Sequence, residues 1–193
     1  MLSKIVKKIT DQIALNVPGI TEEKAEQIDY GLYTAFSDVL KLIAVLLVAL
    51  ILGKLEYALV AVIVFAINKS YLGGIHAKTQ IGCLITHFTI IFSCVYLSEV
   101  IDIRYFNVIL FLVAIVLSVI YAPADLISRP IISIKRKQEL KIKGSIVLLI
   151  CFIATFFVSS VYSNIISLVT LISTINVTPI MYKLTKNKRG GIV

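Results

Sequence analysis

Long apolar blocks separated by short polar stretches make up most of the chain after residue 34. Six such blocks are present, at residues 35–52, 57–68, 81–98, 106–122, 145–162 and 165–182. A straight membrane-spanning helix needs roughly 20 apolar residues, so several blocks are short and the second is the shortest. The pattern predicts an all-α, polytopic membrane protein with about six transmembrane or re-entrant helices. Six full spans are the first interpretation, and four spans with re-entrant segments are the alternative.

The first 34 residues are more polar and have a different periodicity. Apolar side chains recur at helical spacing at Leu2, Ile5, Ile9 and Ile13. This pattern is typical of an amphipathic helix that lies on the surface of a lipid bilayer. Pro18 and Gly19 should end that helix. Thr21 then resembles an N-cap, and the two glutamates after it favour the first turn of a second helix.

The composition supports a membrane protein. Hydrophobic residues make up 59% of the 193 residues and charged residues 16%, whereas soluble domains are about half apolar and a quarter charged. We divide the chain into an interfacial helical region (1–34), a membrane-embedded domain (35–182) and a basic tail (183–193). The formal net charge of +8 could suggest nucleic acid, but aromatic residues do not alternate with the basic ones, so no nucleic-acid partner is expected.

The positions of the lysines and arginines predict the orientation in the membrane. With six spans, Lys54 and Arg104 fall on one side, and Lys41 lies inside the first span, where it is expected to pair with Asp38. The other 16 of the 19 cations (19 minus these three) fall on the opposite side. Both termini and the polar loop near residue 76 are therefore expected to be cytoplasmic.

His76 and Cys83 lie at the start of the third apolar block and are the strongest candidates for catalysis. A thiol becomes a good nucleophile when a base takes its proton, and imidazole is the usual partner. On one straight helix, seven residues would separate the two side chains by about 10 Å along the axis, whereas a base must come within roughly 3 Å of the proton it takes. The pairing therefore requires the segment from Gly73 to Gly82 to bend back as a loop, with Cys83 at the start of the next helix, whose N-terminus favours a thiolate.

His87 is a second candidate for the base, because it lies four residues after Cys83 on the same helical face. It would lie deeper in the bilayer, where a charged imidazolium is costly. Spacing alone does not decide between the two histidines. The number of cysteines is three, with no paired spacing, so neither a disulfide framework nor a metal site or other cofactor is expected.

Two motifs stand out in the chain. The first is Gly73-Gly74-Ile75-His76-Ala77 with Cys83 seven residues after the histidine. The second is Tyr121-Ala122-Pro123-Ala124, followed by Arg129-Pro130-Ile131 and the basic run Lys135-Arg136-Lys137. Together they resemble the accessory gene regulator B (AgrB) family of bacterial membrane cysteine endopeptidases, which act in quorum sensing. The resemblance covers nearly the whole chain. It departs at Lys69, where the family often has arginine, and a lysine cannot reproduce the bidentate contacts of an arginine.

The resemblance implies an activity, a substrate and a location. His76 and Cys83 would be catalytic and would cleave the acidic C-terminal tail from an AgrD-like propeptide through a Cys83 thioester. The propeptide's own cysteine would then close a thiolactone ring. The residues expected to contact the substrate are Lys69, Gly74, Arg129, Lys135, Arg136 and Lys137. The family also implies a bacterial cell membrane and a homodimer.

Two other classes of function remain as alternatives. A small membrane transporter or peptide exporter would show internal repeats with broken helices in both halves. The glycine-rich break at 73–82 has no counterpart in the second half of the chain. A receptor or scaffold that only binds a peptide is the third possibility, and loss of function in Cys83→Ser would separate an enzyme from it.

Overall fold

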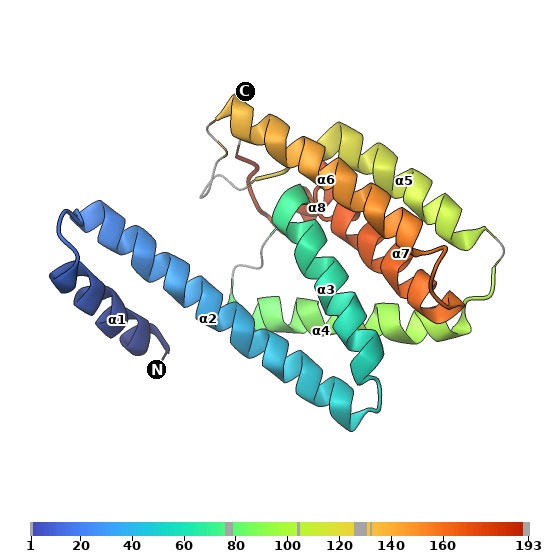
Figure 1. Ribbon diagram of the computed structural model, residues 1–193, viewed down its shortest axis with the longest axis horizontal. Coiled ribbons are helices and arrows are strands. Elements are labelled where there is room, and N and C mark those ends of the chain that lie inside the picture. Colours follow the sequence, from blue (N-terminus) through green and yellow to red (C-terminus); the bar gives the residue numbers. More distant parts are fainter. Residues whose placement is uncertain (1, 76–78, 104, 126–130, 132, 191–193) are drawn as a thin grey trace. The chain divides into compact units, whose positions relative to one another are not determined.

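The computed structural model describes residues 2–75, 79–103, 105–125, 131 and 133–190, and Figure 1 shows that the regular elements among them are helices. The helices are α1 (Leu2–Asn16), α2 (Glu22–Ile51), α3 (Leu55–Leu72), α4 (Gln80–Val100), α5 (Phe106–Tyr121), α6 (Ile134–Ala154), α7 (Ser160–Ile175) and α8 (Pro179–Leu184). The predicted all-α class is confirmed. The chain forms two compact units, Met1–Val48 and Ala49–Val193, and each is described by itself.

The first unit consists of α1 and most of α2. The predicted helix start at Thr21 is confirmed, because the hydroxyl of Thr21 accepts a hydrogen bond from the backbone N–H of Lys24 at 3.3 Å. The hydroxyl of Thr10 on α1 donates to the carboxylate of Asp29 on α2 at 3.4 Å. The division we drew between residues 34 and 35 falls inside α2, which continues past Gly31. A single glycine costs a helix only about 1 kcal/mol, so the long apolar run after it keeps the helix intact.

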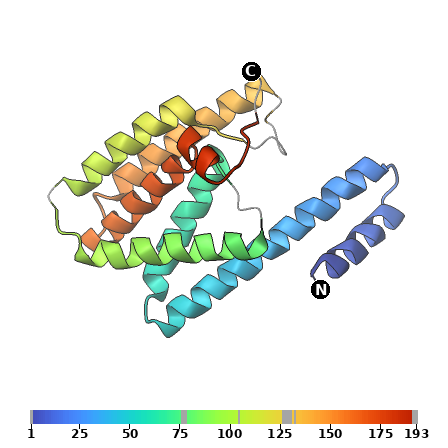
Figure 2. The ribbon, with the colours of Figure 1, turned by 180° about the vertical axis from the view of Figure 1, so that it is seen from behind.

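The second unit is a bundle in which α7 packs against α3, α4, α5 and α6 (Figure 2). Consecutive helices from α3 to α7 alternate in direction. At one end, the hydroxyl of Tyr162 near the start of α7 donates to Glu56 near the start of α3 at 3.1 Å. At the other end, the connection after α3 contacts the end of α7. We name this second end, formed by residues 72–75, 121–125 and 175–190, the site end.

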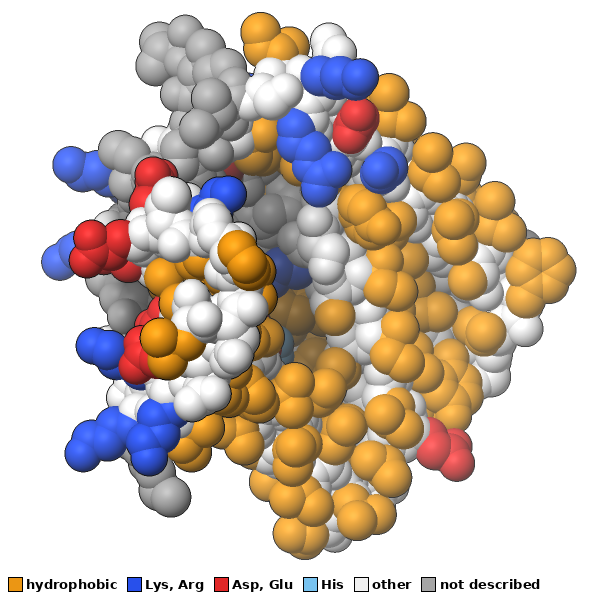
Figure 3. Space-filling model, turned by 60° about the vertical axis from the view of Figure 1, so that its left-hand side comes forward, with side chains coloured by type: hydrophobic (Ala, Val, Ile, Leu, Met, Phe, Trp, Pro, Cys, Tyr) orange, Lys and Arg blue, Asp and Glu red, His pale blue; other side chains and the backbone are white. Residues whose placement is uncertain are grey.

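The surface of the second unit is strongly apolar. In this unit α3 and α4 are long and apolar enough to cross a membrane, as is α2, which lies mostly in the first unit. Helices α5 and α7 are apolar with 16 residues each. On α5, the side chains of Val116 and Ile120 are 56% and 61% exposed. Hydrophobic side chains cover much of the right-hand and lower parts of the view in Figure 3. Such a surface fits lipid rather than water, so the chain is a membrane protein. The choice between six spans and four spans with re-entrant segments stays a prediction.

Two boundaries in the second half differ from those expected. We expected the fifth block to begin at residue 145, but α6 begins at Ile134 and includes the basic run. Lysine, arginine, glutamine and glutamate are good helix formers, so hydrophobicity alone misses these turns. The fifth block was also expected to continue to residue 162, whereas α6 ends at Ala154 and α7 begins at Ser160.

The interior of the bundle contains many small polar side chains, most of them on α7. The hydroxyls of Ser167 and Ser173 donate to carbonyls one turn earlier in the same helix, each at 2.8 Å. Asn164 donates from its side-chain amide to the carbonyls of Ser98 and Ile101, at 3.0 and 2.9 Å, and so holds the end of α4. Small polar residues let helices approach closely in a membrane, which explains the central place of α7.

Candidate functional site

The connection that leaves α3 is fixed by a close backbone contact with the segment after α5. Gly73 and Ala124 form an isolated parallel bridge. The N–H of Gly74 donates to the carbonyl of Ala124 at 2.8 Å, and the N–H of Ala124 donates to the carbonyl of Leu72 at 2.9 Å. Gly73 has a φ of +76°, and a Cβ at this position would lie 2.0 Å from the carbonyl oxygen of Ala124. Only glycine fits here without displacing the bridge.

A third segment, at the end of α7, meets the same connection. The N–H of Ile75 donates to the carbonyl of Asn176 at 3.3 Å. Gly74 has a φ of +108°, and a Cβ there would lie 2.9 Å from the same carbonyl oxygen. The close approach of two backbones therefore explains Gly74 without a substrate contact. Sequence analysis missed Asn176, because a backbone carbonyl leaves no signal in the sequence.

Cys83 lies in the first turn of α4. The hydroxyl of Thr79 caps this helix by accepting a hydrogen bond from the N–H of Gly82 at 3.0 Å, and the N–H of Cys83 donates to the carbonyl of Thr79 at 2.9 Å. The thiol of Cys83 is free and half-buried. Our expectation that Gly82 belongs to the bent loop is wrong, because it is already the third residue of α4.

His76 itself lies outside the described residues, and so does Lys78. The elements around it are clear, since α3 ends at Leu72 and α4 begins at Gln80. His76 and Cys83 therefore do not lie on one straight helix. Such a helix would have held their side chains too far apart for a proton to pass between them. The pairing of the two side chains stays a prediction.

Lys69 contacts the connection that leads to His76. Its ammonium donates to the carbonyl of Ile75 at 2.7 Å and lies over the ring of Phe65, 5.8 Å from the centroid. This bond holds the residue directly before His76. A contact of Lys69 with a substrate stays a prediction.

His87 packs against the same phenylalanine. Its ring meets Phe65 edge to face, with the centroids 5.0 Å apart and an angle of 83° between the planes. This contact fits the interpretation of His87 as a packing residue. Whether His76 or His87 is the base is decided by the variants described below.

Thr79, Gln80 and Asp125 are polar residues near the loop and are candidates for a third residue that orients His76. The hydroxyl of Thr79 serves as the helix cap. One carboxylate oxygen of Asp125 accepts a hydrogen bond from the N–H of Ile131 at 2.7 Å. These bonds give Thr79 and Asp125 roles in the local backbone, and the third residue stays unassigned.

The basic residues expected to bind substrate are located in part. Lys135, Arg136 and Lys137 are exposed in the first turns of α6, whose N-cap Ser133 accepts from the N–H of Arg136 at 3.4 Å. They lie on a helix that begins well before the fifth apolar block, because Ser133 caps a sequence of good helix formers. Arg129 lies outside the described residues.

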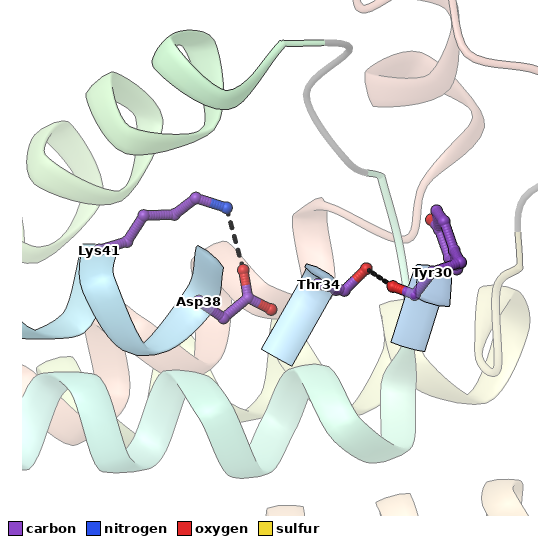
Figure 4. A network of polar contacts seen from close by, with 4 residues as sticks. All are labelled: Tyr30, Thr34, Asp38 and Lys41. Atoms are coloured by element: carbon purple, nitrogen blue, oxygen red, sulfur yellow. Dashed lines mark hydrogen bonds and ion pairs between the residues drawn. The ribbon is translucent and has the colours of Figure 1, made fainter. Parts of the chain in front are cut away.

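Polar side chains on α2, in the first unit, bond to each other within that helix (Figure 4). Lys41 and Asp38 form an ion pair at 3.0 Å, which confirms the expected pairing. The hydroxyl of Thr34 donates to the carbonyl of Tyr30 at 2.9 Å. These contacts satisfy charged and polar groups just before the long apolar run that ends α2.

Within the part of the chain that the structure describes, no three His, Cys, Asp or Glu side chains are close enough together to hold a metal ion.

Comparison with known proteins identifies the family. The accessory gene regulator B family matches residues 6–177 of the chain. A putative AgrB-like protein of Clostridium beijerinckii is 29% identical over 162 residues, which cover 80% of this chain and 79% of that protein. Accessory gene regulator protein B of Staphylococcus aureus (strain MW2) is 30% identical over 160 residues, covering 81% and 83%. No solved structure matches the chain. The chain therefore belongs to the accessory gene regulator B family of quorum-sensing membrane proteins.

Proposed function

We propose that this protein is a membrane cysteine endopeptidase that removes the C-terminal tail of an AgrD-like propeptide. The observation that carries the proposal is the position of Cys83, half-buried in the first turn of a helix that begins four residues after His76. The N-terminus of a helix favours a negatively charged thiolate. The loop before this helix is held by backbone bonds to two distant segments, as an ordered catalytic loop requires.

In the first step, His76 takes the proton of the Cys83 thiol, and the sulfur attacks the peptide carbonyl before the propeptide's tail. The C–N bond breaks, and His76 gives the proton to the departing amine. The propeptide is then joined to Cys83 as a thioester, and the tail is released.

In the second step, the thiol of the propeptide's own cysteine attacks this thioester. A new thioester forms within the propeptide, closing the thiolactone ring, and the Cys83 thiol is restored. Exchange of one thioester for another is nearly balanced in energy, whereas conversion of an amide to a thioester is uphill. Removal of the product must therefore drive the reaction forward. A site shielded by apolar helices also limits attack by water.

The basic surface of α6 supports recognition of an acidic tail. Lys135 and Lys137 are exposed at its start. The guanidinium of Arg136 forms an ion pair with the carboxylate of Glu139, with nitrogen and oxygen 3.6 Å apart. Because exposed pairs of this kind are weak, the cluster keeps most of its positive field and can attract a negatively charged peptide. Arg129, Lys69 and Gly74 complete the proposed contact set.

The distribution of charge along the bundle supports a cytoplasmic site. Lys69, the start of α6 and the basic residues after α8 are at the site end, whereas Lys54 is at the opposite end beside Glu99. Positive residues concentrate on the cytoplasmic side of membrane proteins. We therefore place the site end, together with both termini, in the cytoplasm of a bacterial cell.

Co-expression with the propeptide tests this function, with cleavage followed by mass. Cys83→Ala and His76→Ala should abolish processing, while His87→Ala should retain it. A Cys83→Ser protein that inserts and binds the propeptide without cleaving it would separate an enzyme from a scaffold.

The other outcomes are equally informative. Loss with Cys83→Ala and His87→Ala but not with His76→Ala would assign the base to α4 and contradict our choice of histidine. Cleavage that survives all three changes would contradict the cysteine mechanism and favour a transporter.

A further inference from the structure

Helix α8 and the segment that follows it are both bonded to the connection after α5. The hydroxyl of Tyr182 donates to the carbonyl of Asp125 at 2.8 Å, and the N–H of Gly190 donates to the same carbonyl at 3.2 Å. The guanidinium of Arg189 donates to the carbonyl of Tyr121 at 2.6 Å. Three donors from the last part of the described chain thus hold residues 121–125 at two points.

The same five residues hold the loop that leads to His76. Ala124 bonds to Leu72 and Gly74 through its N–H and its carbonyl, and its neighbour Asp125 accepts the bonds from Tyr182 and Gly190. Residues 121–125 therefore lie between the catalytic loop and the segment after α8. A shift of this connection would be passed directly to Gly74, two residues before His76.

Packing makes this arrangement rigid. Leu72, Ala124, Val177 and Tyr182 belong to one buried cluster, in which none of them is more than 4% exposed. The hydroxyl of Tyr182 is the polar end of a buried ring, so its bond to Asp125 is directional and protected from solvent. Arg189 is exposed and adds a charge-assisted bond from outside the cluster.

We propose that Tyr182 and Arg189 are positioning residues that fix residues 73–75, the segment leading to His76, through the connection 121–125. This inference rests on the proposed function, because it assumes that His76 acts on Cys83. Neither residue needs to touch the propeptide. The segment after α8 thereby belongs to the catalytic apparatus in addition to carrying positive charge.

Steady-state processing of a synthetic propeptide by the full chain in lipid vesicles tests the proposal. Tyr182→Phe keeps the buried ring and removes the hydroxyl, and Arg189→Met keeps much of the length and removes the guanidinium. We expect kcat to fall roughly 10- to 100-fold with little change in KM, since a misplacement of about 1 Å costs on the order of 100-fold. Arg189→Lys should restore part of the rate, because an ammonium can still donate to the carbonyl of Tyr121.

Lys188→Met is the matched control, because it removes the same charge from an exposed neighbour. It should leave kcat near the wild-type value. A loss in Lys188→Met equal to that in Arg189→Met would show that charge rather than the bond to Tyr121 matters, and would overturn the proposal for Arg189.

Alkylation of Cys83 by iodoacetamide, without any propeptide, gives a second readout. Mass analysis of the peptide that carries Cys83 follows the rate as a function of pH. In Tyr182→Phe and Arg189→Met, the dependence of the alkylation rate on pH should move toward that of His76→Ala. The melting temperature should stay unchanged, which separates misplacement of the loop from unfolding. If Tyr182→Phe does not fold, Arg189→Met still decides, since its side chain is exposed.

The two proposals fail in different ways. Wild-type kcat and wild-type alkylation profiles in both variants, with Cys83→Ala and His76→Ala inactive, would overturn the positioning role and leave the proposed function standing. Processing by Cys83→Ala would overturn both.

Discussion

Gly73→Ala is the change that most directly tests the contact between the catalytic loop and the connection after α5. The new methyl group would lie 2.0 Å from the carbonyl oxygen of Ala124, a distance that no real Cβ tolerates. The backbone must therefore move, and the φ of +76° is itself unfavourable for alanine.

The free-energy cost of Gly73→Ala has two parts, the unfavourable backbone conformation of alanine and the loss of hydrogen bonds at the bridge. A non-glycine residue in a sparsely populated backbone region costs about 1–3 kcal/mol. Separation of the bridge breaks the bonds from Gly74 to Ala124 and from Ala124 to Leu72, each worth a net ~0.5–1.5 kcal/mol. The total is roughly 2–6 kcal/mol, comparable to the stability of a whole domain, so the loop opens locally before the bundle unfolds.

Gly53→Ala is the matched control. Gly53 has a similar φ of +66°, but a Cβ there would meet nothing within 4 Å. Its cost is the backbone term alone, about 1–2 kcal/mol. Gly53 lies in the turn between α2 and α3, at the end of the bundle away from the site, so processing should stay near the wild-type rate.

Both variants are assayed for propeptide cleavage in vesicles and for thermal unfolding in detergent. We expect Gly73→Ala to lose nearly all cleavage and to melt lower than Gly53→Ala. Equal losses in the two variants would show that the contact with Ala124 contributes nothing, and wild-type cleavage by Gly73→Ala would refute the role of the bridge.

Three further predictions concern polar contacts inside and at the far end of the bundle. The hydrogen bond to Glu99 raises the pKa of Lys54 above its ordinary value of 10.5, so the stability from this pair is fully present below pH 10.5 and is lost as the pH rises through the raised value. The melting temperature should therefore fall above pH 10.5 more steeply in the wild type than in Glu99→Gln, and equal slopes would contradict the pairing. Asn164→Leu leaves two carbonyls at the end of α4 without their donor, which should cost about 1–3 kcal/mol in thermal unfolding; an unchanged melting temperature would mean that other donors replace the amide. Asn68 donates to Thr170 at 3.3 Å inside the bundle, so Thr170→Val should destabilise by ~1 kcal/mol and the added change Asn68→Leu should recover part of it; a double variant that melts lower than Thr170→Val would refute this.

Helix positions were predictable where local patterns are strong. The Thr21 cap with two glutamates marks the start of α2, and Pro18-Gly19 separates it from α1. The early start of α6 was not predictable from hydrophobicity, because its first turns consist of charged residues that favour helix without favouring a membrane.

The sequence points to candidate side chains at the site but not to the backbone contacts that hold its loop. The Gly73-Gly74 pair signals an unusual backbone, but nothing in the sequence says that the partners are Ala124 and Asn176. Contacts between backbone groups use atoms that every residue has, so residue types carry no record of them. Gly74 illustrates this, because its backbone lies against the end of α7, a contact that no residue type signals, while its contact with substrate stays a prediction.

The contact between Ile75 and Asn176 also sets an order of events during synthesis. Asn176 follows Ile75 by 101 residues (176 minus 75), and Gly190 emerges from the ribosome later still. Membrane proteins are made from the N-terminus at about 5–20 residues per second, so His76 and Cys83 are in place several seconds before the backbone that orders their loop exists. Under the proposed function, a nascent chain carries Cys83 in an unassembled site until its last helices have been added, so propeptide cleavage is expected only from a chain whose bundle is complete.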